Sequence, residues 1–218
     1  IEIIKAMWNG AFQEGAIARY NIGIDVGWRN HPHNGAGIFL TGDVEGSQIY
    51  NNTIIQLSQL QYKAISFSDG WNGPSGWPTN SLIHNNIFYA GGTSPTYHEN
   101  ATFDDRGNVL SQNLYHGAIA PPPEDAAPLT GDPRFVNPAG LTADDFKVTF
   151  GAAAISNGMP VAGNGGLDFF GNAVASGTPP TLGFHEYLSD PVIDSDGDAM
   201  VDLWESVHGL DPGSASDA

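Results

Sequence analysis

The stretch Ser47–Ile54 reads SQIYNNTI, which is a short apolar strand, an asparagine bend and a second short strand. The pattern recurs as SLIHNNIF at 81–88 and NVLSQNLY at 108–115, and more weakly as ARYNI at 18–22. Two strands and a bend that return about every 30 residues are typical of a solenoid. The aligned asparagines are Asn21, Asn52, Asn86 and Asn113, at steps of 31, 34 and 27 residues.

A third strand is predicted before each of the last three bends, at 37–41 (GIFLT), 64–68 (AISFS) and 101–105 (ATFDD). Successive side chains on a strand point to opposite faces. The alternation predicts that Ile38, Leu40, Ile65, Phe67, Ala101 and Phe103 point inward. It predicts that Phe39, Thr41, Ser66, Ser68, Thr102 and Asp104 point outward, where the stacked strands would form a shallow groove.

Asparagine suits these bends because it tolerates a left-handed backbone and its amide can hydrogen-bond to the same residue one repeat away. We therefore predict that the four asparagines form one column. A β-sandwich would also explain frequent turns, but it gives no reason for asparagine to recur at matching bends. The residues favour an all-β fold, a parallel β-helix built as a solenoid of three-strand rungs.

The amino-acid composition argues against several classes of function. Seven Lys and Arg against 24 Asp and Glu give a formal charge of −17, which disfavours nucleic acid as a partner because phosphate binding needs clustered cations. The chain has no Cys, which excludes disulfides and thiolate chemistry, and no long apolar run, so we expect no membrane insertion. Because the chain opens on IEII and stops soon after an acidic motif, we expect one or both ends to be cut from a longer protein, with a missing N-terminal part as a partner.

Five later segments carry a resemblance to a known family. They are GDPRFVNP at 131–138, DFKV at 145–148, AISNG at 154–158, DFFGN at 168–172 and LGFHEY at 182–187. With the repeats, they resemble secreted right-handed parallel β-helix proteins of the pectate-lyase-like superfamily over residues 12–188. The resemblance implies a right-handed β-helix, secretion or cell-surface location, and a polysaccharide partner. It leaves the reaction open, because this fold hosts lyases, hydrolases, epimerases and adhesins.

Two segments after the repeats have predicted roles in a β-helix domain that spans 1–188. The segment 117–128 contains Pro121–Pro123, so we expect a stiff connection that leaves the last repeat and runs back over the surface. The segment 133–187 is predicted to form an irregular C-terminal cap over the open end of the solenoid, where strand edges would otherwise be exposed. Residues 189–218 form a separate acidic motif.

That motif, DSDGDAMVDLWE at 194–205, has the ligand spacing of a calcium loop. Without a cation its carboxylates would repel one another. It resembles thrombospondin type 3-like or EF-hand-like bacterial repeats, and GLDP at 209–212 completes the match. A solvated acidic linker is the alternative. The predicted Ca²⁺ ligands are Asp194, Asp196, Asp198, the carbonyl of Met200, Asp202 and Glu205.

Candidate residues for sugar chemistry lie at the ends of the third strands and in the loops beside them. A lyase needs a cation to neutralise a uronate and a base to remove a proton, whereas a glycosidase needs two carboxylates. The acids could instead cap turns, and the aromatic rings could pack on the fold. The catalytic candidates are Lys63, Asp69, Asp104 and Arg106, and the substrate-binding candidates are Trp28, Arg29, His31, His33, Trp71 and Trp77.

The loop with Arg29, His31 and His33 leads into the strand 37–41, so we expect these side chains beside Thr41, Ser68 and Asp69 at one rim of the groove. The functional hypothesis is a secreted polysaccharide-interacting protein, either a lyase or hydrolase or the C-terminal part of one. The alternative is a structural or adhesive cell-surface β-helix protein with a calcium-stiffened tail. The sequence does not decide whether the chain is an enzyme.

Overall fold

The computed structural model describes residues 2–4, 13–26, 36–57, 63–68, 76–92, 106–188, 195–198, 200, 205, 208–211 and 213–216. The chain divides into two compact units, Ile1–Tyr187 and Leu188–Ala218. Among the described residues, all strands and a short 3-10 helix, η2 (Ala143–Phe146), belong to the first unit. Within the described residues, no helix has both the length and the apolar character needed to cross a membrane.

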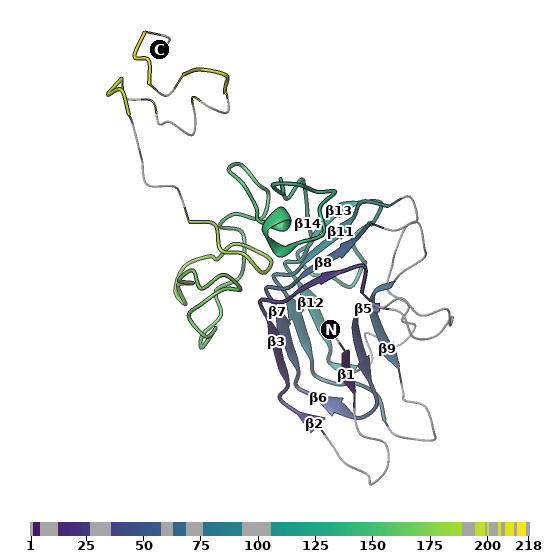
Figure 1. Ribbon diagram of the computed structural model, residues 1–218. Helices are drawn as coiled ribbons and strands as arrows, with labels where there is room; N and C mark the ends of the chain where they lie inside the picture. Colours follow the sequence, from purple (N-terminus) through teal and green to yellow (C-terminus); the bar gives the residue numbers. More distant parts are fainter. Residues whose placement is uncertain are drawn as a thin grey trace. The chain divides into compact units, whose positions relative to one another are not determined.

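Most strands of the first unit belong to three parallel sheets (Figure 1). Sheet 1 has the order β1 (Glu2–Ile4), β5 (Ala36–Thr41), β9 (Lys63–Ser68). Sheet 2 has the order β12 (Val109–Ser111), β10 (Leu82–His84), β7 (Gln48–Tyr50), β3 (Ile17–Arg19). Sheet 3 has the order β14 (Leu129–Thr130), β13 (Leu114–Gly117), β11 (Ile87–Ala90), β8 (Thr53–Gln56), β4 (Ile22–Ile24). A short sheet 4 pairs β2 (Gln13–Glu14) with β6 (Val44–Glu45).

Neighbouring strands in each sheet come from successive repeats of the sequence. In sheet 2, for example, Ile83 lies opposite Ile49 on one side and Leu110 on the other. Every such pair is parallel and follows the alignment of the repeats. The predicted all-β class is therefore confirmed, as are the strands at 37–41 and 64–68, whereas 101–105 lies outside the described residues.

One apolar core is shared by the three sheets. Sheet 1 contributes Ile38 and Ile65, sheet 2 contributes Ile83, and sheet 3 contributes Ile54 and Phe88. The inward positions were correctly predicted where the structure describes them: Ile38, Leu40, Ile65 and Phe67 are all buried.

The outward face of sheet 1 differs from the groove predicted there. Phe39, Thr41 and Ser66 are only 7%, 8% and 6% exposed, and Ser68 is half-buried. Alternation assigns these side chains to the outward face, and it cannot tell whether other parts of the chain cover that face. The outward surface of sheet 1 is therefore closed to solvent at Phe39, Thr41 and Ser66.

The predicted asparagine column is confirmed (sheet 2 passes into sheet 3 at this bend). The Nδ2 group of Asn21 donates to Oδ1 of Asn52 at 2.9 Å. Asn52 donates in the same way to Asn86, and Asn86 to Asn113, again at 2.9 Å. Each Oδ1 also accepts from the backbone N–H of the asparagine that donates to it. The side chains therefore satisfy the N–H groups of Asn21, Asn52 and Asn86 at the bend between the two sheets.

The asparagine of the column was predicted to adopt the left-handed conformation at this bend. In the structure the residue before it does so instead. Positive φ values near 50° are found at Tyr20, Asn51, Asn85 and Gln112. The turn is made one position earlier, which leaves the following asparagine free to aim its amide along the column. This also explains why only two of the four left-handed positions are asparagine: any side chain that accepts the strain of φ > 0 can occupy them.

Asp125 ends the asparagine column. Its Oδ2 atom accepts from Nδ2 of Asn113 at 2.9 Å and from the hydroxyl of Tyr115 at 3.0 Å. Asp125 also forms a parallel bridge with Leu110, and β14 pairs with β13. The prediction that 117–128 runs back over the surface is therefore wrong, because this segment adds a further partial repeat. A carboxylate can only accept hydrogen bonds, so it satisfies the last amide donor without needing a partner beyond it.

The segment 133–187 was predicted to cap the open end of the solenoid. In the structure it packs against the outward face of sheet 3 instead. Ile55, Ile87 and Leu114, from three successive repeats, share one apolar cluster with Phe146 and Phe184. The N–H of Phe184 donates to Oγ1 of Thr53, and the N–H of Gly183 donates to the carbonyl of Asn85. The reason is that the outward positions of sheet 3 are apolar and must be buried.

We predict that Asn86→Leu destabilises the fold by about 1–3 kcal/mol, because it leaves the buried N–H of Asn52 without its acceptor. Asn157→Ala serves as the control, since that side chain is exposed and bonds only to nearby carbonyls. Urea unfolding of both variants measures the difference. A loss for Asn86→Leu no larger than for the control would contradict the role given to the column.

Candidate functional site

A second column of tight turns lies where the chain enters sheet 2. Positive φ values occur at Gly15, Gly46, Asn80 and Gly107, one on each of four repeats. The residues that precede them also correspond: Glu14 lies opposite Glu45 in sheet 4, and Glu45 bridges to Thr79. The N–H of Asn80 donates to the carbonyl of Arg106, which continues the series. Glu14, Glu45, Thr79 and Arg106 therefore follow one another across the repeats.

Two predicted site residues meet at this corner. The guanidinium of Arg106 lies 4.7 Å from the ring centroid of Trp77, which is a cation–π contact. Both side chains are half-buried. Arg106 was predicted as a catalytic residue and Trp77 as a sugar platform, and the structure places them together.

Glu45 and Asn80 complete the corner and were not predicted as site residues. Nδ2 of Asn80 donates to Oε1 of Glu45 at 3.1 Å. Glu45 points outward because the preceding residue, Val44, is fully buried. The sequence does contain a signal for this column: EG precedes the repeat at 14–15 and 45–46, TN at 79–80 and RG at 106–107, so the alignment extends two residues further back.

Of the other residues predicted for the sugar site, Lys63 is described by the structure and the rest are not. Lys63 is the first residue of β9 in sheet 1 and is half-buried. The predicted rim of the groove cannot be placed, because its loop residues are not described. The candidates outside the described residues are Trp28, Arg29, His31, His33, Asp69, Trp71 and Asp104.

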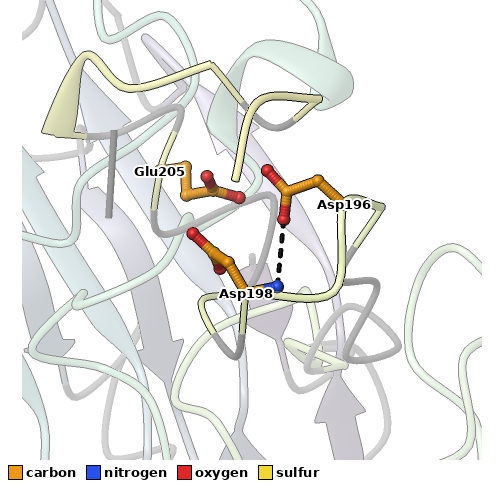
Figure 2. Close-up of side chains that lie close together, drawn as sticks. All are labelled: Asp196, Asp198 and Glu205. Atoms are coloured by element: carbon orange, nitrogen blue, oxygen red, sulfur yellow. Dashed lines mark hydrogen bonds between the residues drawn. The ribbon is translucent and has the colours of Figure 1, made fainter. Parts of the chain in front are cut away.

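The second unit contains a cluster of three carboxylates (Figure 2). One carboxylate oxygen from each of Asp196, Asp198 and Glu205 lies within 4.8 Å of the others, and Glu205 is fully buried. The N–H of Asp198 donates to Oδ1 of Asp196, and that of Met200 to Oδ1 of Asp198, so the loop wraps around the carboxylates. Asp194 and Asp202 lie outside the described residues. Three carboxylate oxygens at this separation could hold a metal cation, which would offset their mutual repulsion.

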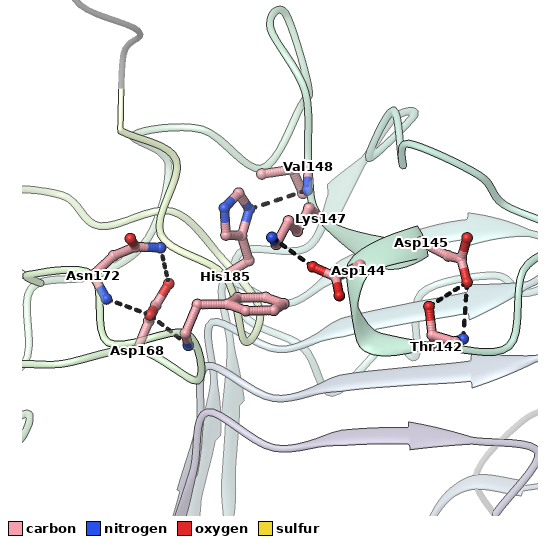
Figure 3. A network of polar contacts seen from close by, with 9 residues as sticks. Thr142, Asp144, Asp145, Lys147, Val148, Asp168, Asn172 and His185 are labelled. Carbon is pink, nitrogen blue, oxygen red and sulfur yellow. Dashed lines mark hydrogen bonds and ion pairs between the residues drawn. The ribbon is translucent and has the colours of Figure 1, made fainter.

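A polar network ties together the segment that covers sheet 3 (Figure 3). Asp168 accepts hydrogen bonds from the backbone N–H groups of Phe170, Asn172 and Glu186. Nδ1 of His185 accepts from the N–H of Val148 at 3.2 Å, so the ring is neutral, and burial lowers the pKa of His185. These groups each satisfy local backbone donors, which indicates a structural role.

Glu186 has the most perturbed carboxyl group of this network. Burial raises the pKa of Glu186 from 4.5 to about 7, although hydrogen bonds from the N–H and hydroxyl of Thr181 oppose the shift. The covering segment therefore prefers the protonated form of this acid. Its ionisation near neutral pH costs stability.

Comparisons with known proteins add no family. No protein-family model matches the chain, and no curated protein matches it either.

We predict that Glu186→Gln stabilises the protein at pH 8 relative to the unchanged protein, and has less effect at pH 5. Because the folded pKa of about 7 lies above 4.5, the stability linked to protonated Glu186 is present below pH 4.5 and is lost as the pH rises through 7. Glu186 is half-buried and still in contact with solvent, so we discount the effect to about 1 kcal/mol, or a Tm difference of about 2–4 °C. Thermal melts at both pH values measure it. Equal Tm differences at pH 5 and pH 8 would rule out this titration.

Proposed function

We propose that the chain is a right-handed parallel β-helix of a secreted protein that interacts with polysaccharide. Three parallel sheets whose neighbouring strands come from successive repeats support the β-helix. The unbroken amide column supports it further, because such a column requires each repeat to lie directly over the last. The handedness follows the rule that parallel crossovers are almost always right-handed.

The observation that carries the polysaccharide proposal is the contact of Arg106 with Trp77, two repeats along the corner from Glu45. An indole ring offers a flat apolar face to a pyranose, while a guanidinium and a carboxylate bond to hydroxyl groups. The corner positions follow one another at a strand spacing of about 4.8 Å and carry Glu14, Glu45, Thr79 and Arg106 in turn, so they form an extended row of side chains that suits a polymer better than a single small molecule. A lyase or hydrolase, or its C-terminal part, is the enzyme class that these groups would serve.

A non-catalytic role is the second candidate, and one specific observation favours it. Phe39, Thr41 and Ser66 are buried on the sheet 1 face where a catalytic groove was expected. A structural or adhesive cell-surface β-helix needs no such groove. In that case the second unit would act as a calcium-stiffened tail.

We propose Ca²⁺ as the ion of the second unit. Asp196, Asp198 and Glu205 would supply carboxylate oxygens, and the carbonyl of Met200 would occupy the seventh loop position. The ion would fix the loop and make the unit rigid. Asp194 and Asp202 are the expected further ligands.

The polysaccharide proposal is tested by a panel of neutral and uronate-containing polysaccharides. Binding is measured by calorimetry, lyase products by ultraviolet absorbance and hydrolase products by new reducing ends. We expect binding to at least one polysaccharide. Products would identify the enzyme class, and binding without products would support the adhesive role. A chain that binds none of them would overturn the proposal.

The calcium proposal predicts heat on titration of the whole chain with Ca²⁺ at neutral pH. The double variant Asp196→Asn/Asp198→Asn should bind at least about tenfold more weakly, because it removes two charged ligands. Asp211→Asn is the matched control, an acid of the same unit outside the cluster. The absence of heat with the unchanged chain, or an equal affinity for Ca²⁺ in the double variant, would contradict the calcium proposal.

A further inference from the structure

The corner presents a graded series of side chains on four repeats. Glu14 is exposed, whereas Glu45, Thr79 and Arg106 are half-buried. Sheet register and backbone hydrogen bonding place them in chain order, one repeat after another. At a strand spacing of about 4.8 Å, three steps separate Glu14 from Arg106 by about 14 Å. Two acids therefore occupy one end of the series and one cation the other.

A side-chain hydrogen bond holds the middle of this series in place. Asn80 donates from Nδ2 to Oε1 of Glu45, which fixes that carboxylate. The next repeat makes room for Asn80, because a Cβ at Gly107 would lie 2.3 Å from Oδ1 of Asn80. Gly107 also has φ of +68°, which other residues rarely adopt. The absence of a side chain at 107 thus allows the amide to reach the carboxylate.

The stacked pair at the far end offers both an apolar and a polar surface. The Arg106 guanidinium packs on Trp77 at 4.7 Å, which orders both side chains. Within the described part of the chain, Nε of Arg106 is buried without a hydrogen-bond partner. Beside them, a Cβ at Gly76 would lie 3.1 Å from the carboxyl group of Asp43, so a third acid borders the loop that carries Trp77.

The charges at this corner select against an acidic ligand. Glu14, Glu45 and Asp43 outnumber Arg106, and the whole chain carries −17. A polymer with a carboxylate on every sugar would be repelled by this surface. Three other described cations are engaged elsewhere: Arg19 with Tyr50, Arg134 with the carbonyl of Phe150, and Lys147 with Asp144.

We infer that the corner formed by Glu14, Glu45, Trp77, Asn80 and Arg106 binds an uncharged, hydroxyl-rich glycan. This inference rests on the proposed polysaccharide function and names its substrate class. Sugar hydroxyls donate to the carboxylates of Glu14 and Glu45 and accept from Arg106 and Asn80. The indole of Trp77 packs against the C–H face of a sugar ring.

The test is calorimetric binding of the whole chain, with Ca²⁺ present throughout, to a soluble neutral β-glucan, a neutral galactomannan and the acidic polymers polygalacturonate and alginate. We expect a neutral polymer to bind with an affinity that does not change between low and high salt, since no net charge is neutralised. We expect Trp77→Ala to weaken binding at least about tenfold. Glu45→Gln, which keeps the shape of an outward side chain, should weaken it about three- to tenfold.

Phe150→Ala is the matched control, because Phe150 is an exposed ring on the covering segment and should leave the affinity unchanged. If Trp77→Ala alters the Tm, Glu45→Gln decides the outcome. Binding of acidic polymers alone would overturn the inference while leaving the proposed polysaccharide function intact. Neutral binding that survives both corner variants would also overturn it. Failure to bind any polysaccharide would overturn the proposed function and the inference together.

Discussion

The hydrogen bond from one asparagine side chain to the next is the interaction on which the rest of the first unit depends. At the bend between sheets 2 and 3, the backbone N–H groups of the column asparagines take side-chain acceptors. Oδ1 of Asn52, Asn86 and Asn113 supplies three of them, and Oδ2 of Asp125 supplies the last one. Because the donor and acceptor lie on adjacent repeats, the column fixes the register in which the repeats pair.

Once the register is fixed, the side chains on the outward faces are fixed as well, and the faces differ in how far the rest of the chain covers them. Sheet 3 presents apolar side chains and is covered by the segment 133–187. The corner before sheet 2 instead carries charged side chains, which are favourable in water: Glu14 is exposed, and Glu45 and Arg106 are half-buried. The burial of apolar surface thus determines which part of the molecule remains accessible for a ligand.

The sequence was sufficient to predict the repeats, their strands and the asparagine column, because each depends on local alternation or on a residue that recurs. It could not predict the partner of the segment 133–187, since apolar residues there would fit an end or a side equally well. The role of Asp125 at the end of the column was missed because Pro121–Pro123 indicated a surface connection. In the structure the buried carboxylate of Asp125 bonds to Asn113, so this part of the chain packs against the last repeat. Trp77 and Arg106 were identified singly, but their contact depends on loop geometry that has no repeating signal.

The most direct test of the asparagine column is hydrogen exchange of asparagine side-chain amides, followed by NMR on the ¹⁵N-labelled chain. The Nδ2 groups of Asn52, Asn86 and Asn113 each bond to the next acceptor inside the fold, so they should exchange far more slowly than the exposed amide of Asn157. Exchange of all three as fast as that of Asn157 would contradict the column, and with it the register of the repeats.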